Sequence, residues 1–262
     1  LTLTAQRSGG RRWVHAAVAS PDSIYLVEEV ERGEGETPQH LLYRWSPATD
    51  ELAPIFDAAT GEPLQLQPRT DRAAGSLGVS GDRLFARSAD HTLCCWQIDS
   101  NQARRQWSVV TDDPEAEIGG TYEVAVSPDG RHLAACRRGH PVHNLLIDAQ
   151  TGAIVDSIPV EGGVNVVTRA IAFDAAGTRL AFGNEKDVFV YDLRTKQQTR
   201  LSGHSLEIRQ VCFLPGRNLL VSGASDRRIC VWDLDKGSLA WELTGHRAAI
   251  ECLGVHPHAD RL

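Results

Sequence analysis

The chain has 262 residues, of which 42% are hydrophobic and 23% charged, and it carries a formal net charge of −7. This balance is that of an ordinary globular protein, and an acidic chain without a concentrated basic face is not expected to bind nucleic acid. No run of about eighteen apolar residues predicts a membrane span, no signal peptide is visible, and we expect a cytoplasmic protein.

Short alternating apolar segments, each ending in a turn, recur along the chain. They occupy residues 17–22, 77–82, 124–130, 171–177, 211–216 and 253–257. The steps between corresponding residues of these segments are 61, 47, 47, 40 and 42 residues. The long first step contains 28–40, which is rich in Glu and Gly and which we interpret as an acidic hairpin insertion with a solvated tip. Alternatively, the insertion meets a basic partner.

Each of these segments is followed by a second apolar run, and then by a third that ends in an aromatic or aliphatic residue plus a polar one. Examples of these endings are Trp96-Gln97, Ile147-Asp148, Tyr191-Asp192 and Trp232-Asp233. A fourth short stretch follows, such as 153–158 or 239–243. Four strands in roughly 40 residues, with turn residues between them, match one propeller blade. No stretch shows sustained helical periodicity, so we expect almost no helix.

The pattern predicts an all-β fold, a β-propeller of four-stranded antiparallel blades in one domain over residues 1–262. Five blades and the start of a sixth are expected at about 11–65, 66–110, 118–160, 163–201, 203–243 and 245–262. The chain begins at Leu1 and contains no Met, so we expect it to be a piece of a longer protein. Because an incomplete ring leaves open strand edges that invite aggregation, we expect further residues or a partner chain to complete the sheet order.

The repeat at 203–243 carries the most specific motif. Its markers, together with the start of the next repeat, are Gly203-His204, Ser222, Asp226, Trp232-Asp233 and Gly245-His246. This spacing resembles the WD-repeat (WD40-type) family, whose blades span Gly-His to Trp-Asp and whose commonest ring has seven blades. The resemblance implies that the chain is part of a seven-bladed ring.

In that family the His, Ser, Asp and Trp of a blade form one buried hydrogen-bonded network. The resemblance therefore assigns a structural network to His204, Ser222, Asp226, Trp232, His246, Asp90 and Trp96. Although His204 and Asp226 look like a catalytic pair, we interpret them as structural, because a buried imidazole must pair both ring nitrogens. Other blades depart from the motif, with Ala86 at the Ser position of the second blade and Ile147 at the Trp position of the third.

Candidate reactive groups have structural interpretations. The six Cys lack CxxC spacing and are expected to be free thiols, most of them buried, with the adjacent Cys94 and Cys95 on opposite strand faces. His140, His143, His256 and His258 lie beside prolines without other ligands at metal spacing, so we expect surface turns. We expect no metal, no cofactor and no catalytic residue.

By resemblance to the family, partners dock on the face that carries the loops before the first strands and between the second and third. The residues placed there are Trp13, His15, Tyr122, Arg169, Glu207, Arg209 and Glu251. Trp, Tyr and Arg are enriched among interface hot spots, and such a rim would suit a peptide with an aliphatic anchor and an acidic group. The alternative is that these side chains only cap the central channel.

The sequence therefore predicts a non-enzymatic scaffold or sensor module that binds other proteins, or other domains of its own parent chain, without nucleic acid or membrane partners. One alternative is a propeller enzyme of lactonase or hydrolase type, with a metal or carboxylate site on the channel axis. A second is a purely structural domain that packs against neighbouring domains.

Overall fold

The computed structural model describes residues 13–19, 22–30, 39–66, 77–88, 92–110, 120–138, 143–160 and 168–255, and every regular element in them is a β-strand. The first blade contains β1 (Trp13–Ala19), β2 (Ile24–Val30), β3 (Gln39–Ser46) and β4 (Glu51–Pro54). The second contains β6 (Gly78–Ser80), β7 (Arg83–Arg87), β8 (Leu93–Asp99) and β9 (Gln102–Val109), joined by β5 (Phe56–Asp57). The third contains β10 (Gly120–Val126), β11 (His132–Arg138), β12 (His143–Asp148) and β13 (Ile154–Pro159).

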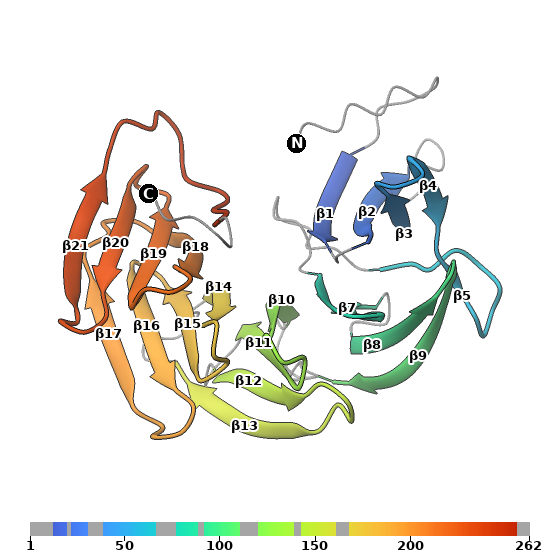
Figure 1. Ribbon diagram of the computed structural model, residues 1–262, viewed down its shortest axis with the longest axis horizontal. Coiled ribbons are helices and arrows are strands. Elements are labelled where there is room, and N and C mark those ends of the chain that lie inside the picture. Colours follow the sequence, from blue (N-terminus) through green and yellow to red (C-terminus); the bar gives the residue numbers. More distant parts are fainter. Residues whose placement is uncertain are drawn as a thin grey trace.

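The fourth blade contains β14 (Thr168–Phe173), β15 (Arg179–Asn184), β16 (Asp187–Asp192) and β17 (Gln198–Ser202). The fifth contains β18 (Ile208–Phe213), β19 (Leu219–Ala224), β20 (Ile229–Asp233) and β21 (Ser238–Leu243). The five blades form an open arc, with the first strand of each nearest the centre and the fourth on the outside (Figure 1). The predicted all-β propeller is confirmed, and no helix that could cross a membrane occurs in the described ranges.

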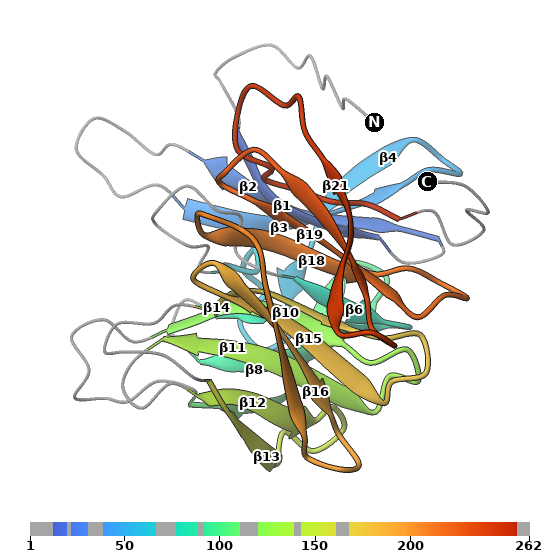
Figure 2. The ribbon, with the colours of Figure 1, turned by 90° about the vertical axis from the view of Figure 1, so that its left-hand side faces the viewer.

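Seen from the side, the strands run across the thickness of the arc, and the connecting loops project from its two faces (Figure 2). A blade with a neighbour on each side contributes to two hydrophobic clusters, because alternate residues of a strand point to opposite faces of the sheet. Cys94 and Cys95 illustrate this, since Cys94 packs in the cluster between the first and second blades and Cys95 in the cluster between the second and third. The opposite orientation predicted for this pair is therefore observed.

The outer strand of the first blade departs from the expected pattern. After β4 the chain leaves the blade, and β5 pairs in parallel with β9, which gives the second blade five strands instead of four. The chain then returns to β3, where Leu42 N–H donates to Leu64 O at 3.1 Å. Ile55, Leu64 and Leu66 are buried in the cluster between the first two blades. This excursion holds the two blades together through backbone hydrogen bonds as well as side-chain packing.

The acidic insertion also differs in part from the expectation. Glu28 and Glu29 belong to β2 and pair with Leu41 and His40 of β3. Glu28, expected in a solvated tip, is buried. The remaining predicted tip, 31–38, lies outside the described residues.

Neighbouring blades meet where an outer strand contacts the next blade's turn between its third and fourth strands. Trp107 of β9 packs on Gly152 in the turn between β12 and β13, and its indole N–H donates to Ala149 O at 3.2 Å. Gly152 has φ +76°, and a Cβ there would lie 2.8 Å from the indole. Glycine is therefore required for both the left-handed backbone and the close approach of the ring.

Residues 245–255 contain no strand, although they dock on the fifth blade. Ile250 N–H donates to Ala224 O at 3.1 Å, as Ile208 N–H donates to Glu185 O at 2.6 Å one blade earlier. Ile250 contacts Gly223 as Ile208 contacts Gly183. On the fifth blade this segment thus takes the place that the start of β18 takes on the fourth blade.

Candidate functional site

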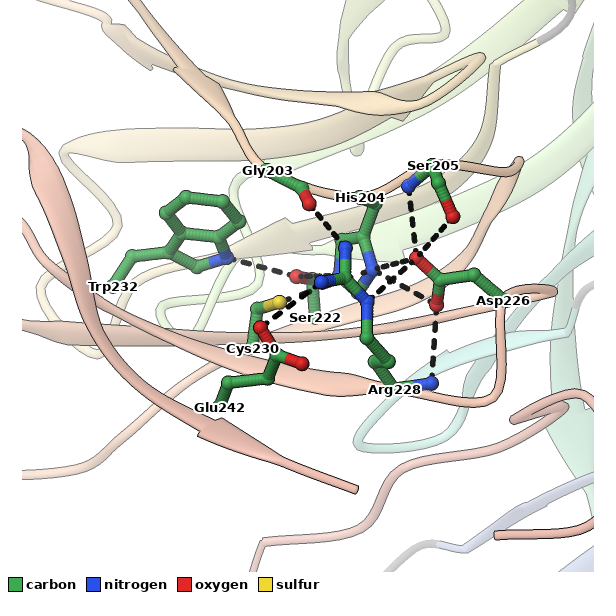
Figure 3. A network of polar contacts seen from close by, with 9 residues as sticks. All are labelled: Gly203, His204, Ser205, Ser222, Asp226, Arg228, Cys230, Trp232 and Glu242. Atoms are coloured by element: carbon green, nitrogen blue, oxygen red, sulfur yellow. Dashed lines mark hydrogen bonds and ion pairs between the residues drawn. The ribbon is translucent and has the colours of Figure 1, made fainter. Parts of the chain in front are cut away.

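Four of the residues assigned to the network meet in the fifth blade. Ser222 lies on β19, Trp232 on β20, Asp226 in the turn between these strands, and His204 in the loop before β18 (Figure 3). His204 Nδ1 lies 2.9 Å from Asp226 Oδ2, and its Nε2 lies 2.8 Å from Ser222 Oγ. Trp232 Nε1 donates to the same Ser222 Oγ at 2.8 Å. We call these four residues the tetrad.

The direction of each hydrogen bond in the tetrad follows from the chemistry of its members. An ionised carboxylate only accepts, so His204 Nδ1 carries the proton and donates to Asp226. In a neutral imidazole the other nitrogen is then an acceptor, and the Ser222 hydroxyl donates its proton to Nε2. The Ser222 oxygen keeps its lone pairs for the Trp232 N–H. Every polar atom of the four side chains is thereby used.

Asp226 is the hub of a wider set of contacts. It accepts hydrogen bonds from the backbone N–H of Ser205 at 2.9 Å and of Arg228 at 3.0 Å. Burial of the carboxyl by itself would raise its pKa, but the hydrogen bonds from Ser205, His204 and Arg228 outweigh burial and lower the pKa to about 2. Asp226 is therefore an anion throughout the physiological pH range, as the tetrad requires.

Arg228 extends the tetrad to the outer strand and was not predicted from the sequence. Its Nε donates to Asp226 Oδ2 at 3.1 Å, its Nη1 to Glu242 Oε2 of β21 at 2.9 Å, and its Nη2 to Gly203 O. One guanidinium thus ties the loop before β18 to β21. In the sequence, the feature that indicates this role is a basic residue two positions after Asp226, the aspartate of the turn.

Aspartate, histidine and serine in this order resemble the arrangement of a hydrolase triad, but the tetrad is not accessible to a substrate. The Ser222 side chain is fully buried, and His204 is 5% exposed. The Ser222 oxygen already accepts the indole N–H, and Gly203 lies against the Trp232 ring. The tetrad joins the loop before β18 to β19 and β20 instead of presenting a nucleophile.

Two of the other three residues assigned to the network, Trp96 and His246, are not joined to a tetrad among the described residues. Trp96 is fully buried on β8, with its indole N–H lacking a hydrogen-bond partner among the described residues. The cause is local, because Ala86 pairs with Cys94 as Ser222 pairs with Cys230, so no hydroxyl is present. His246 is exposed, and Asp90 lies outside the described residues.

The fifth blade holds two of the residues predicted for a partner-binding rim, Glu207 and Arg209. Arg209 Nε donates to Ser225 Oγ at 2.8 Å, and its Nη2 lies 3.5 Å from Glu207 Oε2. Ser225 N–H donates to Glu207 O at 2.8 Å, so the loop before β18 and the loop after β19 lie side by side. Leu206, which was not predicted, is 54% exposed beside them.

The remaining rim residues occupy corresponding backbone positions or lie further along the chain. Trp13 and His15 lie on β1, Tyr122 on β10 and Arg169 on β14, near the starts of these innermost strands, while their side chains are outside the described part of the structure. Glu251 is exposed in the segment that follows the fifth blade. No group of three His, Cys, Asp or Glu side chains that could hold a metal ion occurs in the described ranges. His143 begins β12, and His140, His256 and His258 are outside those ranges.

Comparisons with known proteins agree with the fold and the repeat. Residues 2–243 match the family model described as outer membrane protein assembly factor BamB. The chain is 29% identical over 164 residues to the WD repeat-containing protein SL1-17 of Schistosoma mansoni, which covers 62% of this chain and 50% of that protein. It is 24% identical over 230 residues to the ribosome biogenesis protein YTM1 of Kluyveromyces lactis, covering 84% of this chain and 47% of that protein.

A third relative is the echinoderm microtubule-associated protein-like 4 of Homo sapiens, 25% identical over 189 residues, which cover 68% of this chain and 17% of the relative. The chain thus spans about half the length of the first two relatives and a smaller part of the third. The open arc of antiparallel blades, the tetrad and the family match all point to one conclusion. The chain belongs to the β-propeller family represented by the BamB model, and its blades are WD repeats.

Proposed function

We propose that the chain is a protein-interaction platform, a scaffold or sensor module that binds a partner protein, or another domain of its parent chain, on the face bearing Arg209. The observation that carries this proposal is the way in which Arg209 is held. A hydrogen bond to Ser225 at 2.8 Å and an ion pair with Glu207 at 3.5 Å hold the guanidinium on a loop pair that the fifth blade supports. Side chains fixed before binding lose less conformational entropy when a partner docks.

The chemistry of this rim favours a partner segment with an apolar side chain and an acidic group. Leu206, which precedes Glu207 in the loop before β18 and is 54% exposed, supplies the apolar surface. Arg209 is already paired with Glu207 at 3.5 Å, so an acidic group of the partner would have to compete with Glu207 for the guanidinium. Ion pairs that solvent reaches, as it does this one, are weak, and exchange of one carboxylate for another is therefore not costly.

Pull-down of partners with the longest stable form of the protein tests the proposal. The Leu206→Asp and Arg209→Ala variants are expected to lose a partner that wild type retains. Val155→Asp is the matched control, because Val155 is 52% exposed but lies on the outer strand β13, away from the rim. Equal partner binding by all three variants and wild type would place the docking surface elsewhere.

Binding in place of catalysis is supported by the burial of the tetrad, since its Asp226, His204 and Ser222 are closed to substrate. Elemental analysis of the purified protein provides an independent check. A stoichiometric metal ion would favour the alternative of a propeller enzyme, because such an ion could supply the chemistry that the described side chains do not offer.

A further inference from the structure

Two buried polar side chains stand out at the junction of the third and fourth blades. Asn144 on β12 and Thr168 on β14 both have no exposed surface. The Asn144 Nδ2 and Oδ1 atoms and the Thr168 Oγ1 atom have no hydrogen-bond partner among the described residues. Buried polar groups are rarely left unpaired, because each one loses its hydrogen bonds to solvent on folding.

Both side chains face the same interface. Asn144 pairs across the ladder with Ile158, which packs in the cluster shared by the third and fourth blades. Thr168 pairs with Asn184, two residues along β15 from Phe182 of that same cluster. Residues two apart on a strand point to the same face. Asn144 and Thr168 therefore lie between the two blades, on opposite sides of the interface.

The interface between the fourth and fifth blades shows which side chains occupy the equivalent positions there. Val188 lies three residues before Tyr191, as Asn144 lies three residues before Ile147 at the corresponding end of its strand. Ile208 pairs with Ala224 as Thr168 pairs with Asn184. Val188, Ile208 and Ala224 pack together in one apolar cluster between the fourth and fifth blades. An apolar contact of the repeat is thus replaced by an amide and a hydroxyl at the preceding interface.

The ligand that this pair fits is neutral, small, and able both to donate and to accept. Asn144 offers a donor and an acceptor, and Thr168 a hydroxyl that can do either. The cluster on this side of the interface contains Ala134, Cys136 and Phe189, none of which is charged at neutral pH, and burial raises the pKa of the Cys136 thiol. Asn144 and Thr168 carry no charge that could neutralise an ion, and because both side chains are fully buried the ligand must be small.

We propose that Asn144 and Thr168 form an internal water site, in which bound water bridges the third and fourth blades. Internal waters of this kind make about three hydrogen bonds to buried polar groups and are part of the folded structure. The bridge replaces the apolar packing to which Val188 and Ile208 both contribute at the next interface. It gives this one junction a directional, hydrogen-bonded contact.

A double-mutant cycle in the 262-residue chain tests the site through the sign of each effect. If water bridges the pair, Asn144→Val and Thr168→Val each lower the midpoint of urea unfolding, because the remaining polar group loses its bridge. The double variant, which resembles the Val188 and Ile208 contact, should then lose less than the sum of the two single effects. If the two groups are simply unpaired, both single substitutions raise the midpoint, and the proposal is wrong.

Two further measurements keep the test decisive if a variant unfolds. Val188→Asn places an amide opposite Ile208, where no hydroxyl can share a water, and should lower the midpoint. A high-resolution crystal structure of the wild-type chain should show ordered water within hydrogen-bond distance of both Asn144 and Thr168. Density for water at neither residue, or additive effects in the cycle, would overturn the proposal.

Discussion

Removal of one hydroxyl, in Ser222→Ala, tests the whole tetrad. Ser222 Oγ has two partners at 2.8 Å, the indole N–H of Trp232 and Nε2 of His204. The substitution leaves both of these groups buried and unpaired, and the alanine methyl group cannot replace either bond. Each buried group that loses its partner costs about 1–3 kcal/mol, so the free energy of unfolding should fall by about 2–6 kcal/mol.

That loss is a large fraction of the stability of a typical domain, which is about 5–15 kcal/mol. The assay is urea unfolding followed by far-UV circular dichroism, together with amide hydrogen exchange along β19 and β20, where the loss of protection should concentrate. A decrease below about 0.5 kcal/mol, the size of an ordinary surface substitution, would refute the argument that the tetrad secures the blade.

The second blade allows the reverse experiment. Ala86 occupies the position of Ser222, and the buried Trp96 N–H beside it has no partner among the described residues. Ala86→Ser would offer this indole an acceptor, and a hydrogen bond contributes about 0.5–1.5 kcal/mol net. We expect the free energy of unfolding to rise by that amount, whereas an unchanged or lower value would show that the Trp96 N–H is satisfied in another way.

Three further substitutions or treatments have defined outcomes. Gly152→Ala should destabilise the chain more than Gly61→Ala in thermal unfolding, because both have φ above +70° but only at Gly152 would the Cβ meet another side chain, at 2.8 Å; equal losses would argue against that close approach. The pKa of Asp226 is lowered from 3.8 to about 2 in the folded chain, so the stabilisation from its carboxylate is present above pH ~4 and is lost as the pH falls towards 2. The change amounts to roughly 2 kcal/mol. Asp226→Asn should abolish this pH dependence in acid unfolding curves. Cys252 is exposed whereas Cys136 is buried with a raised pKa, so iodoacetamide followed by peptide mass spectrometry should label Cys252 first; early labelling of Cys136 would contradict its burial.

Much of the architecture is already contained in local sequence. Alternation of apolar residues predicts strands because a strand repeats every two residues, and turn residues separate those strands at blade spacing. The Gly-His to Trp-Asp spacing identified all four members of the tetrad, since each occupies a defined position of the repeat. The same pattern could not predict that Trp96 lacks a partner, because that depends on which side chain lies across the ladder.

Other features arise only when segments distant in sequence meet. The parallel pairing of β5 with β9 has no local signal, because Phe56 contacts Gln102 through backbone groups that every residue carries. Arg228 joins the tetrad only because the strand order brings Glu242 and Gly203 within reach of one guanidinium. Asn144 is only a polar residue within an apolar strand until the fourth blade covers it. Sequence alone therefore determined the strands, their grouping into WD repeats and the tetrad, whereas the tertiary structure decided which polar groups are buried at the junctions between blades, since burial depends on the neighbouring blade and not on the strand itself.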